Sequence, residues 1–178
     1  AELAMGPDEI WVAEGTYAPR GVADPAVVSL PEGVYLYGGF AGTETDVSQR
    51  TVAAHVTLID GQGGAGVVAG DDTAVDGFSF DGCGPADPMV SERGGVACVD
   101  VSGVAVFSCT FLDNAPGVRM YVAYGVTIWS CTFDGAQPSY GAAAISASVS
   151  NAAWISDCDF TGNASQGSVV HSEGGCRF

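Results

Sequence analysis

The 178-residue chain contains no lysine, and its only strongly basic residues are five arginines. Against 21 aspartates and glutamates, these arginines leave a net charge of −16. A chain with no basic patch cannot neutralise a phosphate backbone, so the composition excludes a nucleic-acid binder and argues against docking on anionic lipid. No apolar run approaches the ~20 residues that span a bilayer, so we expect no membrane insertion.

Helix-forming residues are also scarce. Five leucines stand against 23 valines, and valine, threonine, phenylalanine and tyrosine favour strands. The 26 glycines and eight prolines recur at short intervals and leave few windows for a helix of three turns. With 47% hydrophobic and 15% charged residues the chain can bury a core. The composition predicts one all-β domain over residues 1–178.

A Cys-x-Phe unit recurs in the C-terminal half, and steps of 22 residues extend its spacing upstream. The resulting anchor positions are Val34, Val56, Phe78, Cys109, Cys131, Cys158 and Cys176, and a strand at 10–12 adds an eighth rung. A period near 22 is typical of a solenoid whose parallel strands stack ~4.8 Å apart. We therefore predict a parallel β-helix of about seven to eight coils, with the seven anchors in one internal column.

Two longer intervals between anchors place insertions at Gly84 to Glu92 and Gly135 to Tyr140. Both segments are rich in residues that favour turns, so we expect protruding loops. They are either inert excursions or sites for a partner.

Several segments resemble a known family. The runs Asp8 to Tyr17 and Gly33 to Thr45, and the Cys-Thr-Phe-x-x-Asn form at Cys109 to Asn114, are similar to secreted bacterial right-handed parallel β-helix repeat proteins, close to the polymorphic outer-membrane-protein repeats. The resemblance implies a right-handed β-helix that is extracellular or displayed on the cell surface. It implies a structural or adhesive role, as an adhesin for example, and only sometimes a polysaccharide lyase or hydrolase.

Six cysteines in a chain that resembles secreted proteins suggest disulfides. Cys83 and Cys98 flank one insertion and form one candidate pair. The stacked anchors allow the pairs Cys109–Cys131 and Cys158–Cys176, because neighbouring Cα atoms would lie within disulfide range. The alternative for these anchors is a column of buried free thiols that act as small hydrophobic side chains.

If the anchors point inward, alternate residues point outward. The predicted outward columns are Ser79, Thr110, Thr132 and Asp159, and beside them Asp81, Leu112, Asp134 and Thr161. Such a face could hydrogen-bond sugars or is simply a solvated surface. The densest acidic cluster, Asp71, Asp72, Asp76 and Asp81, is the candidate Ca²⁺ site, although the expected role requires no cofactor.

The two ends of a solenoid expose unpaired strand edges and core residues unless they are capped. No capping helix is evident before Ile10, Trp11 and Val12, and the anchors continue to Cys176 and Phe178. We expect either a domain that is truncated or uncapped at its C-terminal end, or subunits stacked head to tail into a filament. The partners expected from the sequence are thus a second copy or a surface glycan or protein. A carbohydrate-active enzyme or glycan-binding module is the alternative function.

Overall fold

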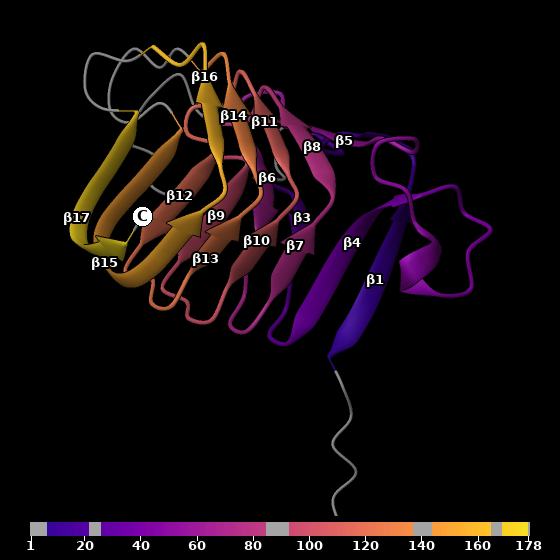
Figure 1. Ribbon diagram of the computed structural model, residues 1–178, viewed down its shortest axis with the longest axis horizontal. Helices are drawn as coiled ribbons and strands as arrows, with labels where there is room; N and C mark the ends of the chain where they lie inside the picture. The colour runs from indigo at the N-terminus through magenta and orange to yellow at the C-terminus, as the bar shows by residue number, and fades with distance from the viewer. Residues whose placement is uncertain (1–6, 22–25, 85–92, 137–143, 165–168, 178) are drawn as a thin grey trace, which may run out of the picture.

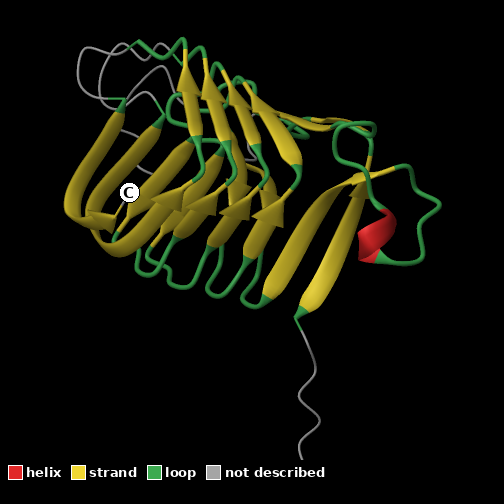
Figure 2. Ribbon diagram, viewed as in Figure 1, coloured by secondary structure: helices red, strands yellow, loops and turns green. Residues whose placement is uncertain are grey.

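The computed structural model describes residues 7–21, 26–84, 93–136, 144–164 and 169–177. The chain winds into a parallel β-helix in which each coil contributes three strands, so that three faces run along the molecule (Figures 1 and 2). No helix in these ranges is long and apolar enough to cross a bilayer.

Each face is a ladder of parallel strands. The first face holds β1 (Asp8–Ala13), β4 (Val34–Phe40), β7 (Ala74–Asp76), β10 (Ala105–Phe107), β13 (Thr127–Trp129) and the second half of β15 (Ile145–Ser156). The second face holds β2 (Gly15–Tyr17), β5 (Thr57–Asp60), β8 (Phe78–Asp81), β11 (Thr110–Leu112), β14 (Thr132–Asp134) and β16 (Asp159–Thr161). The third face holds β3 (Ala26–Ser29), β6 (Ala65–Val68), β9 (Val96–Val99), β12 (Val118–Tyr121), the first half of β15 and the beginning of β17 (Val170–Arg177), whose end follows β15 onto the first face. Because β15 bends from the third face to the first, the two faces join into one sheet.

The predicted all-β solenoid is confirmed, but the number of coils is about six and not seven to eight. The single column of seven anchors is wrong in part. Phe78, Cys109, Cys131 and Cys158 share one column on the second face, as the registers of the adjoining residues show. Val34 lies on the first face opposite Asp8, Val56 is 51% exposed just before β5, and the backbone of Cys176 lies opposite Ala153.

The physical reason for this error is an insertion in the second coil. Residues 41–56 separate β4 from β5 and contain the short helix η1 (Val47–Gln49). A step of 22 residues across this insertion therefore moves from one face to another. The residue that takes the anchor position in this coil is the buried Thr57, which lies opposite Phe78.

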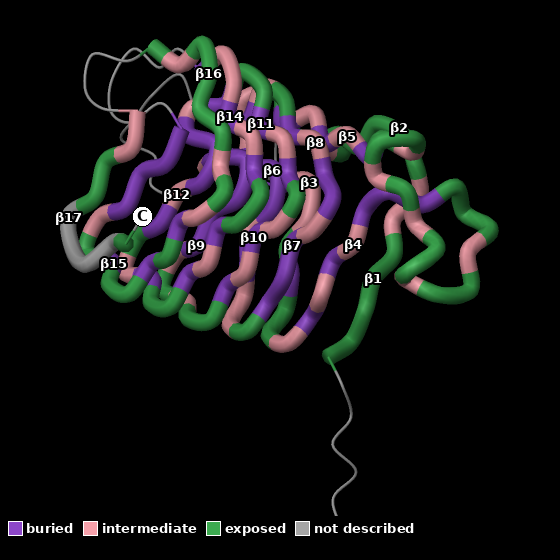
Figure 3. The backbone as a smooth tube through the Cα atoms, in the orientation of Figure 1, coloured by how far each residue is buried: buried purple, intermediate pink, exposed green. Residues whose placement is uncertain are grey.

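A stack of phenylalanine rings runs through the core from coil to coil, among buried aliphatic residues such as Leu36, Val67 and Ile128. Figure 3 marks the buried residues along the backbone. The ring centroids of Phe80, Phe111, Phe133 and Phe160 follow one another at 4.9, 4.7 and 5.1 Å, with interplanar angles of 6 to 8°. A glycine of the third face lies against each of the first three rings. A Cβ at Gly66, Gly95 or Gly117 would stand 2.6 to 2.8 Å from a ring carbon, closer than carbon atoms pack, so glycine leaves the space that the ladder needs.

Two asparagines fasten neighbouring coils together. Asn114 accepts a hydrogen bond from the backbone N–H of Cys83 at 2.8 Å and donates one to the carbonyl of Phe80 at 2.9 Å. Asn163 makes the same pair of bonds two coils later, to Ala136 and Phe133. Each side chain thus satisfies one donor and one acceptor of the preceding coil.

The corner between the first and second faces is a single residue in the left-handed conformation. Gly77, Ser108, Ser130 and Asp157 occupy this corner with φ between 48° and 80°. One such residue turns the chain. Inward and outward side chains therefore do not simply alternate from the strand before the corner to the strand after it. Val106 is fully buried and Phe107 points outward, although Cys109 points inward.

Candidate functional site

The outer face of the first sheet carries a line of aromatic side chains, which we call the aromatic strip. Its members are Trp11, Tyr35, Tyr37, Phe107, Trp129 and Trp154. They alternate with buried residues such as Leu36, Val106 and Ile128, so they project away from the core. Trp11, Trp129 and Trp154 are 37, 49 and 51% exposed.

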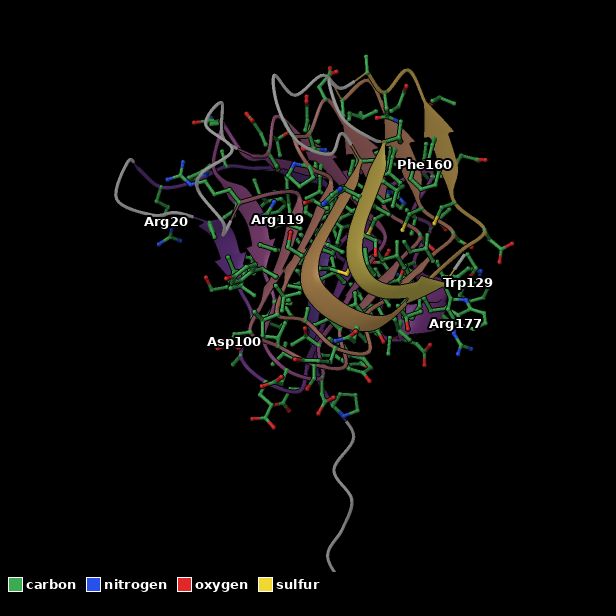
Figure 4. All side chains as sticks on the ribbon, turned by 90° about the vertical axis from the view of Figure 1, so that its left-hand side faces the viewer. Arg20, Asp100, Arg119, Trp129, Phe160 and Arg177 are labelled. Carbon is green, nitrogen blue, oxygen red and sulfur yellow. The ribbon has the colours of Figure 1, made fainter. Side chains whose placement is uncertain are left out.

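All three tryptophans of the chain belong to this strip. Aromatic side chains are large apolar groups that a monomeric protein ordinarily buries, and a group of them that is exposed in part marks an interaction surface. In Figure 4, Trp129 and Arg177 lie on the right of the molecule, and Arg20 and Arg119 lie on its left.

The register of the strands fixes two outward columns. One column contains Trp11, Tyr37, Asp76, Phe107, Trp129 and Ser156. The other contains Glu9, Tyr35, Ala74, Ala105, Thr127 and Trp154, and the backbone of Arg177 follows opposite Trp154. In the last two coils each indole therefore stands opposite a hydroxyl side chain.

Carboxylates orient two of the indoles. The indole N–H of Trp129 donates to Asp157, and that of Trp11 donates to Glu9 at 2.9 Å. Ring contacts orient the same two indoles: Phe107 meets Trp129 edge to face at 6.1 Å, and Trp11 stacks on Phe40 at 5.0 Å. These contacts hold the strip in place before any partner arrives.

Arg50 joins the insertion of residues 41–56 to the strip. Its guanidinium forms an ion pair with Asp76, donates to the carbonyl of Gly38, and lies 5.0 Å from the ring centroid of Tyr37. Burial first, and then the carboxylates of Glu9 and Asp76, raise the pKa of Tyr37. The Arg50 contact neutralises the one carboxylate inside the aromatic column and leaves that part of the strip without net charge.

The four aspartates of the predicted Ca²⁺ site are spread over two faces and a turn. Asp71 and Asp72 lie in the turn before β7, Asp76 lies on β7, and Asp81 lies at the end of β8. Asp71 accepts hydrogen bonds from the backbone and hydroxyl of Ser102. Within the described ranges no three acidic, histidine or cysteine side chains lie close enough together to hold a metal ion.

The cysteine side chains that the structure describes, those of Cys83, Cys98, Cys109, Cys131 and Cys158, are all free thiols. None of the predicted disulfides is formed among them. Cys109 and Cys158 both lie beside Cys131, whose pKa is raised first by the Cys109 thiol and then by burial. The alternative prediction, a column of free thiols, describes the arrangement. The pair Cys158–Cys176 does not fit the register, because the backbone of Cys176 lies opposite Ala153.

The predicted outward columns of the second face are confirmed. Ser79, Thr110 and Thr132 are half-buried, Asp159 is exposed, and all four lie in register. Beside them Asp81, Leu112 and Thr161 are exposed and Asp134 is half-buried. Of the predicted loops, residues 85–92 and 137–140 lie outside the described residues. Phe178 lies outside them as well.

The third face carries Arg119 on β12. The guanidinium of Arg119 donates to the hydroxyl of Ser146 at 2.9 Å, and burial lowers the pKa of Arg119. Its Nε is buried without a partner among the described residues. Arg119 therefore lies on a different face from the aromatic strip.

These features define a class of protein: a parallel β-helix with a phenylalanine core and an aromatic outer face. The model of the right-handed β-helix region matches residues 32–178, and the chain therefore belongs to the right-handed β-helix family. Comparison with curated proteins and with solved structures gave no match.

The sequence placed Trp11 only at an end for self-association, and Trp129 and Trp154 did not emerge from it as site residues. A signal that could have found Trp129 is the position two residues before each anchor, occupied by Asp76, Phe107, Trp129 and Ser156. Strict alternation back from the cysteines places Phe107 and Trp129 inside, and only the left-handed corner residue moves them outside.

Proposed function

We propose that the protein is an extracellular or cell-surface β-helix module with a structural and adhesive role, and that the aromatic strip holds its partner. The observation that carries this proposal is the position of all three tryptophans on the outer face of one sheet. Trp129 and Trp154 expose about half of their surface at the cost of unfavourable hydration, and a partner that covers them removes this cost.

The rest of the chain supports a binding role. The phenylalanine stack and the asparagine clamps give a rigid scaffold, which a flat contact surface needs because a mobile one loses entropy on binding. The net charge of −16 keeps the module away from acidic surfaces and favours partners that are uncharged or basic.

The test is retention of the purified protein on particulate cellulose, particulate chitin and immobilised extracellular-matrix protein. We expect the wild type to be retained on at least one surface and the double variant Trp129→Ala/Trp154→Ala to be released. The matched control is Tyr121→Ala/Tyr124→Ala, which removes two exposed aromatics outside the strip. Equal retention of wild type and strip variant, or no retention of the wild type, contradicts the proposal.

A second candidate role is end-to-end association. Ile10 is 44% exposed although it lies opposite the buried Leu36, and Phe160 is 37% exposed at the end of the phenylalanine stack. Strands that stack coil on coil can in principle stack subunit on subunit. Sedimentation velocity tests this role: the wild type should form larger species as MgCl₂ screens the acidic charge, and Ile10→Asp should not. A monomer at every salt concentration contradicts it.

The alternative of a carbohydrate-active enzyme stays a prediction. The same polysaccharides, incubated with the protein and assayed for new reducing ends or unsaturated uronates, would test it.

A further inference from the structure

We infer that the ligand of the aromatic strip is an uncharged, extended polysaccharide that lies along the helix axis over Phe107, Trp129 and Trp154. This inference rests on the proposed function, because it concerns the same surface. It adds the chemical class of the ligand, its direction on the molecule, and the residues that contact it.

The first argument is the mixture of indoles and hydroxyls in the last two coils. Trp129 on β13 lies opposite Ser156 on β15, and Trp154 on β15 lies opposite Thr127 on β13. The two tryptophans are therefore diagonal neighbours with a hydroxyl beside each. A sugar ring has an apolar face of C–H groups and a rim of hydroxyls, so this pattern offers an aromatic plane and a hydrogen-bonding group for every ring.

The second argument is the fixed carboxylate beside Trp129. Asp157 occupies the left-handed corner directly after β15 and accepts the indole N–H of Trp129. A carboxylate has two oxygens with about four acceptor positions, so one hydrogen bond from an indole leaves it able to accept from sugar hydroxyls. Small-molecule sites in proteins combine aromatic surface with a few such oriented polar groups.

The third argument concerns direction. The strip crosses the strands, so its members repeat along the axis at the coil spacing of ~4.8 Å. One sugar unit of an extended chain is about as long as this spacing. A polymer that runs along the axis therefore places successive rings over successive coils, from Phe107 on β10 to Trp154 on β15. A chain along the strands would instead lie over a single coil and meet only one of these three aromatic side chains.

The fourth argument is charge. The strip is bordered by Glu9 and Asp157, and Asp76 is already neutralised by Arg50. The molecule as a whole carries −16. Uronates and sulfated sugars would meet repulsion both at the strip and at long range, whereas a neutral glycan meets none. Among the described residues, Arg177 opposite Trp154 is the cation in register with the strip, so acidic glycans form the natural comparison.

The experiment measures tryptophan fluorescence during titration with cellohexaose, with chitohexaose and with hexagalacturonate. We expect at least one neutral hexasaccharide to change the emission saturably and hexagalacturonate to leave it unchanged. Trp129→Ala and Trp154→Ala should each weaken binding by about tenfold, which is the scale of one aromatic contact. Trp129→Phe, which keeps an aromatic plane, should weaken it less, and Tyr121→Ala should leave it unchanged.

Two results overturn the inference and leave the proposed function standing. One is strip-dependent retention on immobilised protein with no response to either neutral hexasaccharide. The other is a saturable response to hexagalacturonate alone. Far-ultraviolet circular dichroism of each variant separates loss of binding from loss of fold, and Tyr121→Ala serves as the folded reference.

Discussion

The thiols of Cys83 and Cys98 are buried away from water. Burial raises the pKa of each from 9.0 to about 12. The thiolate is the reactive form, so neither side chain should react with a water-soluble reagent in the folded protein at pH 8. Mass spectrometry after iodoacetamide treatment should find both unmodified until the chain is unfolded in denaturant. Rapid native labelling of Cys98, or a Cys83–Cys98 disulfide in the non-reduced digest, contradicts the free buried thiols.

The same pKa shift makes the stability of the folded state fall at alkaline pH. The folded state holds the proton of Cys98 more tightly than the unfolded state does, so its stabilising effect is complete below pH 9 and is lost as the pH rises toward 12. The wild type should therefore lose more unfolding free energy over this interval than Cys98→Ala does. Urea titrations of both proteins at pH 8, 9.5 and 10.5 measure the difference. Parallel loss in both proteins contradicts the assignment.

Asn114 is 1% exposed and makes both of its hydrogen bonds to the preceding coil. Asn114→Ala leaves a buried N–H of Cys83 and a buried carbonyl of Phe80 unpaired. We expect a loss of roughly 2 to 4 kcal/mol in unfolding free energy, because each unsatisfied buried group costs ~1 to 3 kcal/mol. Urea denaturation measures it. Asn163→Ala, at a half-buried site, is the control and should cost less. Equal and small losses would mean that the clamps contribute little.

At the scale of elements, the strands of the third face pack a glycine ladder against the phenylalanine stack. A Cβ at Gly95 would lie 2.6 Å from both a ring carbon of Phe111 and the carbonyl oxygen of Gly117. Gly95→Ala should therefore destabilise the fold by about 1 to 3 kcal/mol through overpacking. Gly21→Ala is the matched control, because a Cβ there meets nothing within 4 Å. Urea denaturation that gives the same midpoint for both variants contradicts the ladder.

The sequence predicted these elements where the coils share a corner position and an anchor position. From Phe78 to Cys158 each coil has a left-handed residue at the corner and an inward anchor after it, so the recurring anchors find the strands β8, β11, β14 and β16 despite the two longer intervals between them. The prediction fails in the second coil, where residues 41–56 add length between β4 and β5. It also fails for β17, whose backbone follows β15 and places Cys176 opposite Ala153.

The candidate site was harder to predict than the fold. Counting alternate residues from Cys131 correctly gives Thr132 as outward, but it also gives Trp129 as inward. The left-handed residue Ser130 changes the direction of the chain between them, and neither serine nor aspartate at this corner is a strong signal for positive φ. The tryptophans therefore read as core residues until the corner is known.

At the scale of the whole molecule, acidic residues far outnumber basic ones. Without lysine, 21 acidic residues repel one another over a small rod, and this repulsion is stronger in the compact state than in the unfolded chain. Added salt should therefore raise the thermal midpoint, since the Debye length falls from ~30 Å at 0.01 M to ~10 Å at 0.1 M. Calorimetry at these two NaCl concentrations measures the shift. A midpoint that falls or stays constant contradicts the repulsion.

The aromatic strip is the central feature of the account at this scale, because it gives a rigid scaffold one surface with a chemical preference. The most direct test is a ¹H–¹⁵N spectrum of the labelled protein, in which the three tryptophans give three indole signals. Addition of cellohexaose or chitohexaose should shift the signals of Trp129 and Trp154, assigned through Trp129→Phe and Trp154→Phe. Indole signals that stay in place at saturating concentrations of both hexasaccharides would contradict the account.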